Sequence, residues 1–291
     1  MLTLQILLGG LAQGCIYGLV ALGFVLIYKA TETINFAQGE LMMLGAFVCW
    51  ALIDVLKLHF VAAVVIGLLL MFVFGVIVER ALLRPILGQP AFTVVMLTFG
   101  LGYMVRGAIA MVPGVGTETH VLSAPYRNVM LRPGGLVLPA EQLVVIASTL
   151  ALAGALFALF RYTRIGIAMQ AASQNQLAAF YMGIPVKRLN GLVWGLGAAV
   201  ATLAGLLLAP FTFVHAGMGF IGLKAFPAAV IGGFGSMPGA IVGGLIVGLI
   251  ESFAGFYLPE GFKDIAAYVA VLVVLVIKPN GLFGEATRKK V

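Results

Sequence analysis

Four ionisable side chains stand inside otherwise apolar stretches, and these are the residues of this chain most able to do chemistry. They are Glu40, Arg106, Lys224 and Glu251. An ionisable group in a membrane helix is costly to bury, so it usually faces a partner or a water-filled interior. These residues are therefore candidates for lining a polar pathway or for pairing with one another inside the membrane. Charges this few and this scattered do not indicate a proton or sodium relay.

Two amide side chains extend the polar character of the stretch around Glu40. Asn35 and Gln38 precede Glu40 within about two helical turns. The spacing keeps the three side chains off one helical stripe, and Gly39 allows a break in the helix. Two interpretations stay open: the three residues line a polar pathway, or they form the interfacial end of a helix, where polar groups cost little.

Lys224 and Glu251 belong to the last third of the chain. Lys224 lies about one turn inside its apolar segment, so it either reaches the membrane interface along its own methylenes or lines a polar pathway. Glu251 has no partner close in sequence, and Arg106 is a candidate tertiary partner because both lie in mid-segment. Our candidates for the translocation pathway are Asn35, Gln38, Glu40 and Lys224.

Motifs for catalysis, nucleotide binding and metal binding are absent from the sequence. No G-x-x-x-x-G-K-[ST] is present, and the GGFGS run at residues 232–236 lacks the lysine and the preceding strand of a phosphate-binding loop. No H-E-x-x-H is present, and the three histidines are scattered. Cys15 and Cys49 lie in apolar segments, which predicts free thiols. We therefore expect no catalytic residue, no metal site and no cofactor bound by this chain.

The composition places the chain in a membrane. Of its 291 residues, 62% are apolar and 9% are charged, and the mean hydropathy is +1.14. Soluble domains carry about 25% charged residues. The net charge of +7 does not indicate nucleic acid, because the basic residues are scattered at the ends of apolar segments. We predict an all-α polytopic membrane protein with about 8–10 transmembrane helices, some short or broken.

A membrane-spanning helix needs about 20 apolar residues, and nine segments reach or approach that length. The seventh and ninth are short, so each is expected to be tilted, broken or re-entrant. In order, the segments are Leu4–Tyr28, Phe36–Ile53, Phe60–Val78, Ala91–Val112, Ala140–Phe160, Leu189–Phe213, Phe220–Gly235, Gly239–Leu258 and Ile265–Ile277.

The distribution of positive charge predicts the orientation. Eleven of the 17 Lys and Arg residues fall between segments on one side of the membrane, four fall on the other, and two lie within segments. Cytoplasmic loops carry the excess of positive charge. This places the loop 161–190 and the tail 278–291 in the cytoplasm, and the N-terminus and the loop 113–139 outside. The assignment requires the seventh segment to cross fully.

The loop 161–190 is the longest water-compatible run in the second half of the chain. Two basic residues stand at each end of it, and small residues predict one helix from Ala168 to Met182. Gly183 and Pro185 then form a helix stop signal. A short surface helix between two long apolar ones suggests a docking element on the cytoplasmic face, and an ordinary connecting loop is the alternative.

Two stripes of small residues predict close contacts between helices. One follows the first segment at Gly10, Gly14 and Gly18, and the other follows the eighth segment. Such stripes let a second backbone approach, and structural packing is their usual role. The second stripe consists of Gly239, Gly243, Gly244 and Gly248.

Several motifs together resemble the permease subunits of branched-chain amino acid ABC importers, and more closely the shorter of the two permeases. The motifs are NFAQGELMMLGAF at residues 35–47, the loop Gly166–Pro185, KAFPAAVIGGFGSMPGAIVGGLIVGLIES at residues 224–252 and KPNGLFG at residues 278–284. The resemblance spans nearly the whole chain. It implies a single transmembrane permease domain, residues 1–291, in the bacterial inner membrane, whose loop 161–190 contains the coupling helix.

The resemblance also implies partners: a second permease subunit, two ATPase subunits that bind the ATP and Mg, and an extracytoplasmic substrate-binding protein. The importer loop pattern E-A-A-x-x-x-G is partly kept, since Ala178, Ala179 and Gly183 match it and Leu177 replaces the Glu. The residues expected to dock on an ATPase are Gly166, Ala171, Ala172, Ser173, Gln174, Asn175, Ala178, Ala179 and Gly183.

Two other classes of protein fit the sequence less well than an importer subunit. A self-contained secondary transporter or channel often shows inverted repeats and a midplane ionisable pair, and no convincing repeat is present. A structural membrane scaffold would not need charged residues inside its segments. The expected solute is a branched-chain or related amino acid, although specificity in such systems lies largely in the binding protein.

Overall fold

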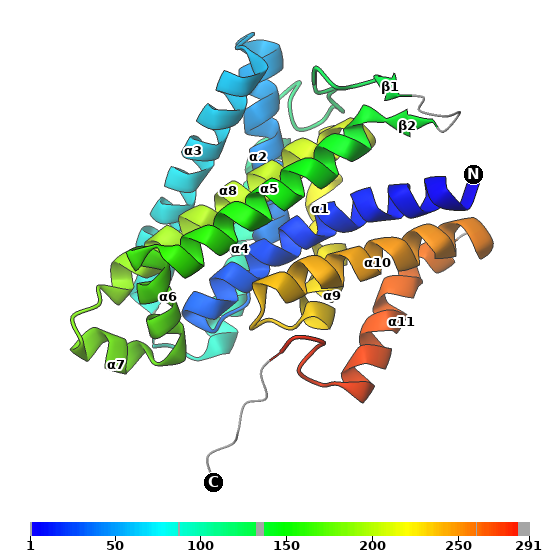
Figure 1. Cartoon of the computed structure of the whole chain (residues 1–291). Coiled ribbons are helices and arrows are strands. Elements are labelled where there is room, and N and C mark those ends of the chain that lie inside the picture. The colour runs from blue at the N-terminus through cyan, green and yellow to red at the C-terminus, as the bar shows by residue number, and fades with distance from the viewer. Residues whose placement is uncertain (1, 87, 132–136, 260, 285–291) are drawn as a thin grey trace.

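The computed structural model describes residues 2–86, 88–131, 137–259 and 261–284, and in these ranges the chain is a bundle of helices (Figure 1). Seven helices are long and apolar enough to cross a membrane, and a shorter apolar helix spans residues 216–232. The prediction of an all-α polytopic membrane protein is confirmed. The long helices are α1 (Leu2–Thr31), α2 (Gln38–Trp50), α3 (Phe60–Val78), α4 (Ala91–Ala110), α5 (Ala140–Tyr162), α8 (Val186–Thr212) and α10 (Met237–Tyr257).

Shorter elements connect and extend the long helices. Two π-helical turns lengthen α2 and α3, and one short hairpin joins β1 to β2 in antiparallel register. The shorter elements are α6 (Arg164–Gln174), α7 (Gln176–Tyr181), α9 (Ile221–Gly232), α11 (Phe262–Ile277), the π-helical η1 (Ala51–Val55) and η2 (Glu79–Leu83), the 3₁₀-helical η3 (Arg84–Ile86) and η5 (Ala216–Phe220), β1 (Met130–Leu131) and β2 (Leu138–Pro139).

Helix α1 lies at the centre of the bundle, between α5 and α10 (Figure 1). Its glycine stripe packs against α10, which carries the second glycine stripe. The sequence predicted a close helix contact for each stripe but did not pair the two. A Cβ added to Gly14 would meet the Leu245 Cα at 2.7 Å, and one added to Gly248 would meet the Gly14 Cα at 2.3 Å. Glycine on both helices therefore lets the two backbones touch. The other two glycines of the α10 stripe, Gly239 and Gly243, pack against α9 instead.

The seventh predicted segment is a broken helix. The chain leaves α8, pairs Val214 with His120 in an isolated bridge, makes the 3₁₀ turn η5 and continues as α9. Gly219 and Gly222 at the break pack against the backbone of Gly39. A Cβ on Gly39 would clash with the Gly219 carbonyl, and a Cβ on Gly222 would clash with the Gly39 Cα. α9 ends at Gly233, whose φ of +94° suits glycine.

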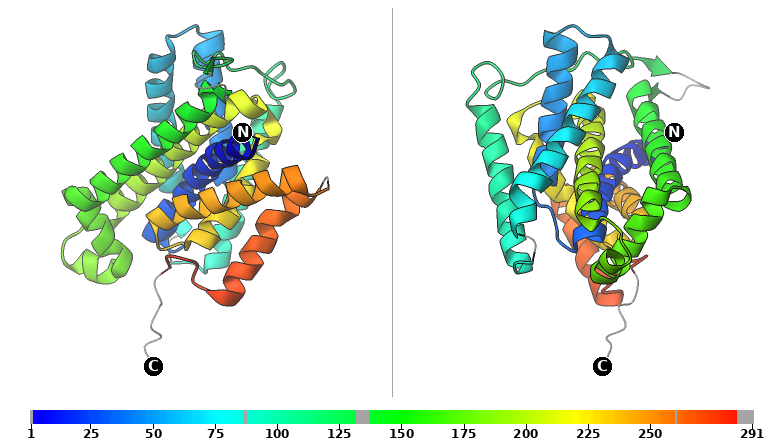
Figure 2. Two further views of the ribbon diagram at one scale, coloured as in Figure 1. Left: turned by 45° about the vertical axis from the view of Figure 1, so that its right-hand side comes forward. Right: turned by 90° about the vertical axis from the view of Figure 1, so that its left-hand side faces the viewer.

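The start of α1 and the end of α11 lie at opposite ends of the bundle (Figures 1 and 2). We call the end that holds the start of α1 the N-terminal end, and the opposite one the α7 end. After α11, the Leu282 N–H donates to the Ile231 carbonyl at 2.8 Å, which holds the KPNGLFG motif on the turn between α9 and α10. Residues 285–291 of the predicted tail lie outside the described residues, and the sidedness of the two ends stays a prediction.

The loop 113–139 is held against the N-terminal end of the bundle. The His120 ring stacks on Trp50 with centroids 3.9 Å apart, and the Ser123 N–H donates to Asp54 at 3.2 Å. β1 and β2 close its second half, although residues 132–136 fall outside the described ranges. Within its described part, the loop is thus tied to η1 and to the end of α2.

The contact between α1 and α10 gives a test by single glycine substitutions. In Gly14→Ala the new methyl group must push against the α10 backbone, so we expect the free energy of unfolding to fall by about 1–3 kcal/mol. In the control Gly100→Ala, on α4, nothing lies within 4 Å of the new Cβ, and higher helix propensity should raise stability by about 0.5–1 kcal/mol. Denaturant unfolding in detergent micelles measures both. Equal stability of the two variants would contradict the packing.

Candidate functional site

The segment between α5 and α8 folds as two short helices rather than one. Thr163 caps α6, since its Oγ1 accepts the Gly166 N–H at 3.0 Å. Asn175 is extended (φ −159°), ends α6 and caps α7 by accepting the Ala178 N–H at 2.9 Å. The prediction of a single helix from Ala168 to Met182 is therefore wrong: asparagine caps a new helix more readily than it continues an old one.

The predicted stop at Gly183 is confirmed in detail. Gly183 has φ +81°, its N–H donates to the Phe180 carbonyl, and the Ile184 N–H donates to the Ala179 carbonyl, both at 3.0 Å. This pair of bonds is a Schellman motif, which satisfies carbonyls that the end of a helix leaves unpaired. The chain then turns through Pro185 into α8.

Burial divides the predicted docking residues into two groups. Ala172 and Ala179 are each only 5% exposed, and Gly166 is buried against α5, where a Cβ would lie 2.3 Å from the Leu159 carbonyl. These three pack within this chain. Of the others, Ala171 and Ser173 are half-buried, and the exposed ones are Gln174, Asn175, Ala178 and Gly183.

Large apolar side chains cover the outer side of α7, and the predicted docking set did not contain them. Leu177, Phe180, Tyr181 and Met182 are 66%, 63%, 78% and 83% exposed, respectively. We call these four residues the α7 surface. Helix α7 itself lies beyond the ends of α5 and α8, at the lower left of Figure 1. Exposed apolar clusters of this kind mark interaction sites. The run LAAFYM between two basic pairs was the sequence signal that could have identified it.

Side-chain bonds fix α6 and α7 to the bundle. The Gln176 amide donates to the Ala30 carbonyl in the last turn of α1 at 2.8 Å, and the Gln170 amide donates to the Phe160 carbonyl of α5 at 3.1 Å. Nearby, Arg84 pairs with the buried Glu79 at 2.8 Å and donates to the Lys187 carbonyl at 3.0 Å. These bonds tie α7 to α1, α6 to α5, and η3 to the start of α8.

Asn35 and Gln38 are fully buried and bonded within the chain. The Gln38 amide donates to the Gly197 carbonyl of α8 at 3.1 Å, and the Asn35 amide donates to the Gln38 Oε1 at 3.2 Å. The Asn35 Oδ1 accepts the Ala37 N–H at 3.0 Å. The break in the helix thus precedes Gln38 rather than occurring at Gly39. In this conformation the two amides hold the start of α2 against α8, and their place in a pathway stays a prediction.

Glu40 forms an ion pair with Arg106 across α2 and α4. The Arg106 Nε lies 3.3 Å from the Glu40 Oε2, and the guanidinium stands 3.7 Å from the centroid of the Phe220 ring at the end of η5. The hypothesis that Arg106 pairs with Glu251 is therefore wrong. A small cavity of about 50 Å³ borders the Glu40–Arg106 pair. Because Arg106 also contacts Phe220, the pair holds the broken segment against α2 and α4.

Lys224, the fourth pathway candidate, forms an ion pair with Asp264 of α11. Both side chains are partly exposed, with Lys224 at 33% and Asp264 at 65%. Because Asp264 lies in the first turn of α11, the pair joins α9 to the start of α11. Lys224 thus finds its counter-charge in a neighbouring helix.

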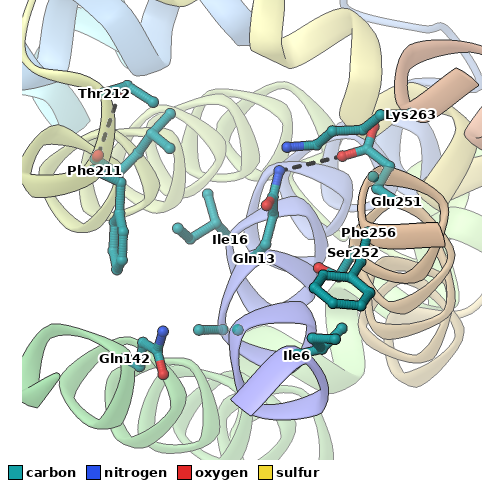
Figure 3. Close-up of a pocket in the computed structure, with 14 residues that line it drawn as sticks. Ile6, Gln13, Ile16, Gln142, Phe211, Thr212, Glu251, Ser252, Phe256 and Lys263 are labelled. Atoms are coloured by element: carbon teal, nitrogen blue, oxygen red, sulfur yellow. Dashed lines mark hydrogen bonds between the residues drawn. The ribbon is translucent and has the colours of Figure 1, made fainter. Parts of the chain in front are cut away.

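Glu251 lies in a separate polar cluster between α10 and α1. The carboxylate is 0% exposed, and its Oε2 accepts the Tyr17 hydroxyl at 2.6 Å and the Gln13 amide at 3.2 Å. It borders a cavity of about 560 Å³, shown in Figure 3, which Lys263 also lines. Gln13 and Tyr17 were missed from the sequence, where their i, i+4 spacing in the first apolar segment was the available signal.

In the part of the chain that the structure describes, no three His, Cys, Asp or Glu side chains gather in a group that could hold a metal ion. Cys15 and Cys49 are buried free thiols.

Comparisons with known proteins agree on one family. Residues 6–277 match the family described as the permease component of branched-chain amino acid transport systems. The chain is 30% identical to the high-affinity branched-chain amino acid transport system permease protein LivH of Escherichia coli K12, over 99% of this chain and 97% of LivH. It is 29% identical to the corresponding protein BraD of Pseudomonas aeruginosa, over 99% and 98%.

A more distant relative and a solved structure extend the comparison. The probable branched-chain amino acid transport permease protein LivH of Methanocaldococcus jannaschii is 27% identical, over 98% of this chain and 94% of that protein. PsaBC from Streptococcus pneumoniae, solved in complex with Fab, has a TM-score of 0.51 at 15% identity, over 94% of this chain and 92% of that one. The latter shows a shared fold.

The Glu40–Arg106 pair is testable by a double-mutant cycle. Arg106→Met leaves the Glu40 carboxylate without its partner in a largely buried place, so the free energy of unfolding should fall by about 3–5 kcal/mol. Adding Glu40→Gln removes that charge, so the double variant should be more stable than Arg106→Met alone. Denaturant unfolding in micelles measures each variant. Strictly additive losses would mean that the two side chains do not interact.

Proposed function

This chain belongs to the family of permease components of branched-chain amino acid transport systems, and we propose that it is the membrane permease subunit of an ATP-driven importer. Its solute is a branched-chain or related amino acid. The chain forms the membrane path together with a second permease subunit. The sequence lacks a phosphate-binding loop, so the energy of ATP must enter from other chains.

Two ATPase subunits bind the nucleotide and its Mg²⁺, and this chain binds neither. ATP binding and hydrolysis shift the permease between states open to one side and states open to the other. Such a shift needs a mechanical link between an ATPase and the helices that move. α6 and α7 provide that link, because Gln176 bonds to the end of α1 and Gln170 to the end of α5.

The main support for this proposal is the exposure of the α7 surface. It consists of four large apolar side chains, all at least 63% exposed, on a helix capped at both ends. A rigid apolar protrusion of this kind can dock in a groove on a partner protein, and docking is favourable because it removes apolar area from water. Ala172 and Ala179 position α6 and α7 from the inner side, and the α7 surface makes the contact. Gln174, Asn175 and Ala178 lie exposed beside it.

An extracytoplasmic binding protein delivers the amino acid at the N-terminal end of the bundle. In this proposal α6, α7 and the C-terminal residues lie in the cytoplasm of a bacterial cell and the N-terminus lies outside the inner membrane. The excess of Lys and Arg in the segments assigned to the cytoplasmic side supports this orientation. The loop 113–139 then faces the binding protein.

Cysteine labelling tests this orientation. A cysteine in place of Ser123 should react with an impermeant maleimide in intact cells, and a cysteine in place of Gln174 should react only after permeabilisation, because the two exposed positions lie at opposite ends. Cys15 and Cys49 are buried and serve as an unreactive background. The reverse pattern would overturn the orientation.

Aspartate substitutions test the docking role of the α7 surface. Leu177→Asp and Phe180→Asp each place a charge in the contact with the ATPase, and a buried unpaired charge weakens an interface strongly. We expect the amount of ATPase that co-purifies with the permease to fall about tenfold or more. ATP-dependent amino acid uptake by the reconstituted importer should fall in parallel, while thermal stability of the permease stays unchanged because both positions are exposed.

Gln89→Asp is the matched control, since Gln89 is exposed at the same end of the bundle but lies outside α6 and α7. It should retain the ATPase. Ala172→Glu and Ala179→Glu are unsuitable, because they place a carboxylate inside this chain. Full ATPase retention by both aspartate variants would reject the docking role. Accumulation of amino acid by this chain alone, driven by an ion gradient, would instead favour a secondary transporter.

A further inference from the structure

The cavity beside Glu251 has the features of a binding site for a small charged molecule. Its volume of about 560 Å³ falls in the range of small-molecule pockets, about 300–1,000 Å³. Five helices contribute to its lining: α1, α5, α8, α10 and α11. Figure 3 shows Gln13 and Glu251 joined by a hydrogen bond at one side of it, with Lys263 reaching the same place.

We propose that this cavity binds the amino acid during transport, with the α-ammonium group of the solute on the Glu251 carboxylate and its α-carboxylate on the Lys263 ammonium group. The proposal rests on the importer function argued above and adds the residues that recognise the solute.

The carboxylate of Glu251 is half satisfied in this structure. Its Oε2 accepts two hydrogen bonds, from Tyr17 and Gln13, whereas its Oε1 is buried and has no hydrogen-bond partner among the described residues. A buried carboxylate without full pairing is unfavourable. An incoming ammonium group carries three donors and a positive charge, so it can replace the Gln13 amide on Oε2 and supply the carboxylate with a counter-charge. Tyr17 meanwhile holds the carboxylate in place.

Lys263 supplies the opposite charge. None of the ion pairs among the described residues involves it. Its methylenes lie along α10 because Gly255 has no side chain; a Cβ there would stand 3.2 Å from the Lys263 Cδ. The ammonium group is thereby directed over the cavity rather than away from it (Figure 3). The cavity therefore offers one negative and one positive group, the complement of a zwitterion.

The remaining lining suits an aliphatic side chain. Ile16 of α1, Leu208 and Phe211 of α8 and Phe256 of α10 form apolar walls. Contact with these walls removes the apolar area of a leucine-like side chain from water, which favours its binding. An amine or a carboxylic acid with the same side chain would satisfy only one of the two charged groups and leave the other unpaired, so the cavity should discriminate against both.

The position of the cavity agrees with a site for an arriving solute. Gln142 lies in the first turn of α5, Phe211 in the last turn of α8 and Lys263 in the first turn of α11. The cavity thus occupies the N-terminal end of the bundle, which faces outside in the proposed orientation. A solute released by the binding protein would meet it first.

Photo-crosslinking tests the proposal in the complete importer, reconstituted with both permeases, the ATPases and the binding protein. The probe is a diazirine analogue of leucine, which should label peptides that contain Ile16 or Leu208. Excess leucine should abolish this labelling. Isoamylamine, which lacks the carboxylate, and isocaproic acid, which lacks the ammonium group, should leave it in place.

Two variants remove one charge each. Glu251→Gln keeps the size of the side chain, and Lys263→Met keeps its length; each should lower both the labelling and the ATP-driven leucine uptake about tenfold or more. Co-purification with the ATPases should be unchanged. The matched controls Glu118→Gln and Lys57→Met remove exposed charges at the same end of the bundle, away from the cavity, and should retain labelling and uptake.

Wild-type labelling and uptake in both variants would overturn the proposal. Should Glu251→Gln fail to fold, Lys263→Met decides alone, because Lys263 is exposed and its loss leaves no buried group unpaired. Failure of the importer function itself has a different signature: the complete wild-type assembly would not take up leucine with ATP. Normal wild-type uptake with unaffected variants rejects the cavity site only.

Discussion

The direct backbone contact between α1 and α10 is the constraint on which the other helices depend. Gly14 touches Gly244 and Leu245, and Gly248 touches Gly14, so these glycines cannot be replaced by larger residues without moving the two backbones apart. Lipid tails are as apolar as leucine, and close packing between small residues therefore replaces hydrophobic burial as the force that joins helices. With α1 fixed at the centre, α5, α8 and α9 pack around it and the more exposed helices α3 and α4 lie outside.

A membrane interior also requires polar groups to find partners within the protein. The chain meets this requirement in separate clusters that each join different helices. Glu40 and Arg106 join α2 to α4, and Asn35 with Gln38 joins the start of α2 to α8. Only the Glu251 cluster leaves a buried side-chain oxygen free among these groups, and it borders a large cavity. This difference sets the Glu251 cluster apart from the polar groups that only join helices, and it is the basis of the proposed solute site.

The two ends of the bundle present different surfaces. At the α7 end, four exposed apolar residues stand on a short helix that hydrogen bonds fix to α1 and to its own Schellman turn. At the N-terminal end, residues from five helices line the cavity. Because α1 touches both, through Gln13 at one end and the Ala30 carbonyl at the other, it connects the proposed ATPase contact with the proposed solute site.

The sequence by itself determined the class of fold, the places of the long helices, the two glycine stripes and the helix stop at Gly183. These features depend on local hydropathy, on residue size and on the conformational freedom of glycine, all of which can be read along the chain. Tertiary structure decided the rest. Arg106 pairs with Glu40, 66 residues away, rather than with Glu251, and Ala172 and Ala179 face inward while Phe180 faces out. Which residues meet, and which face of a short helix stays free, follow from how helices distant in sequence pack together, and no local pattern encodes that.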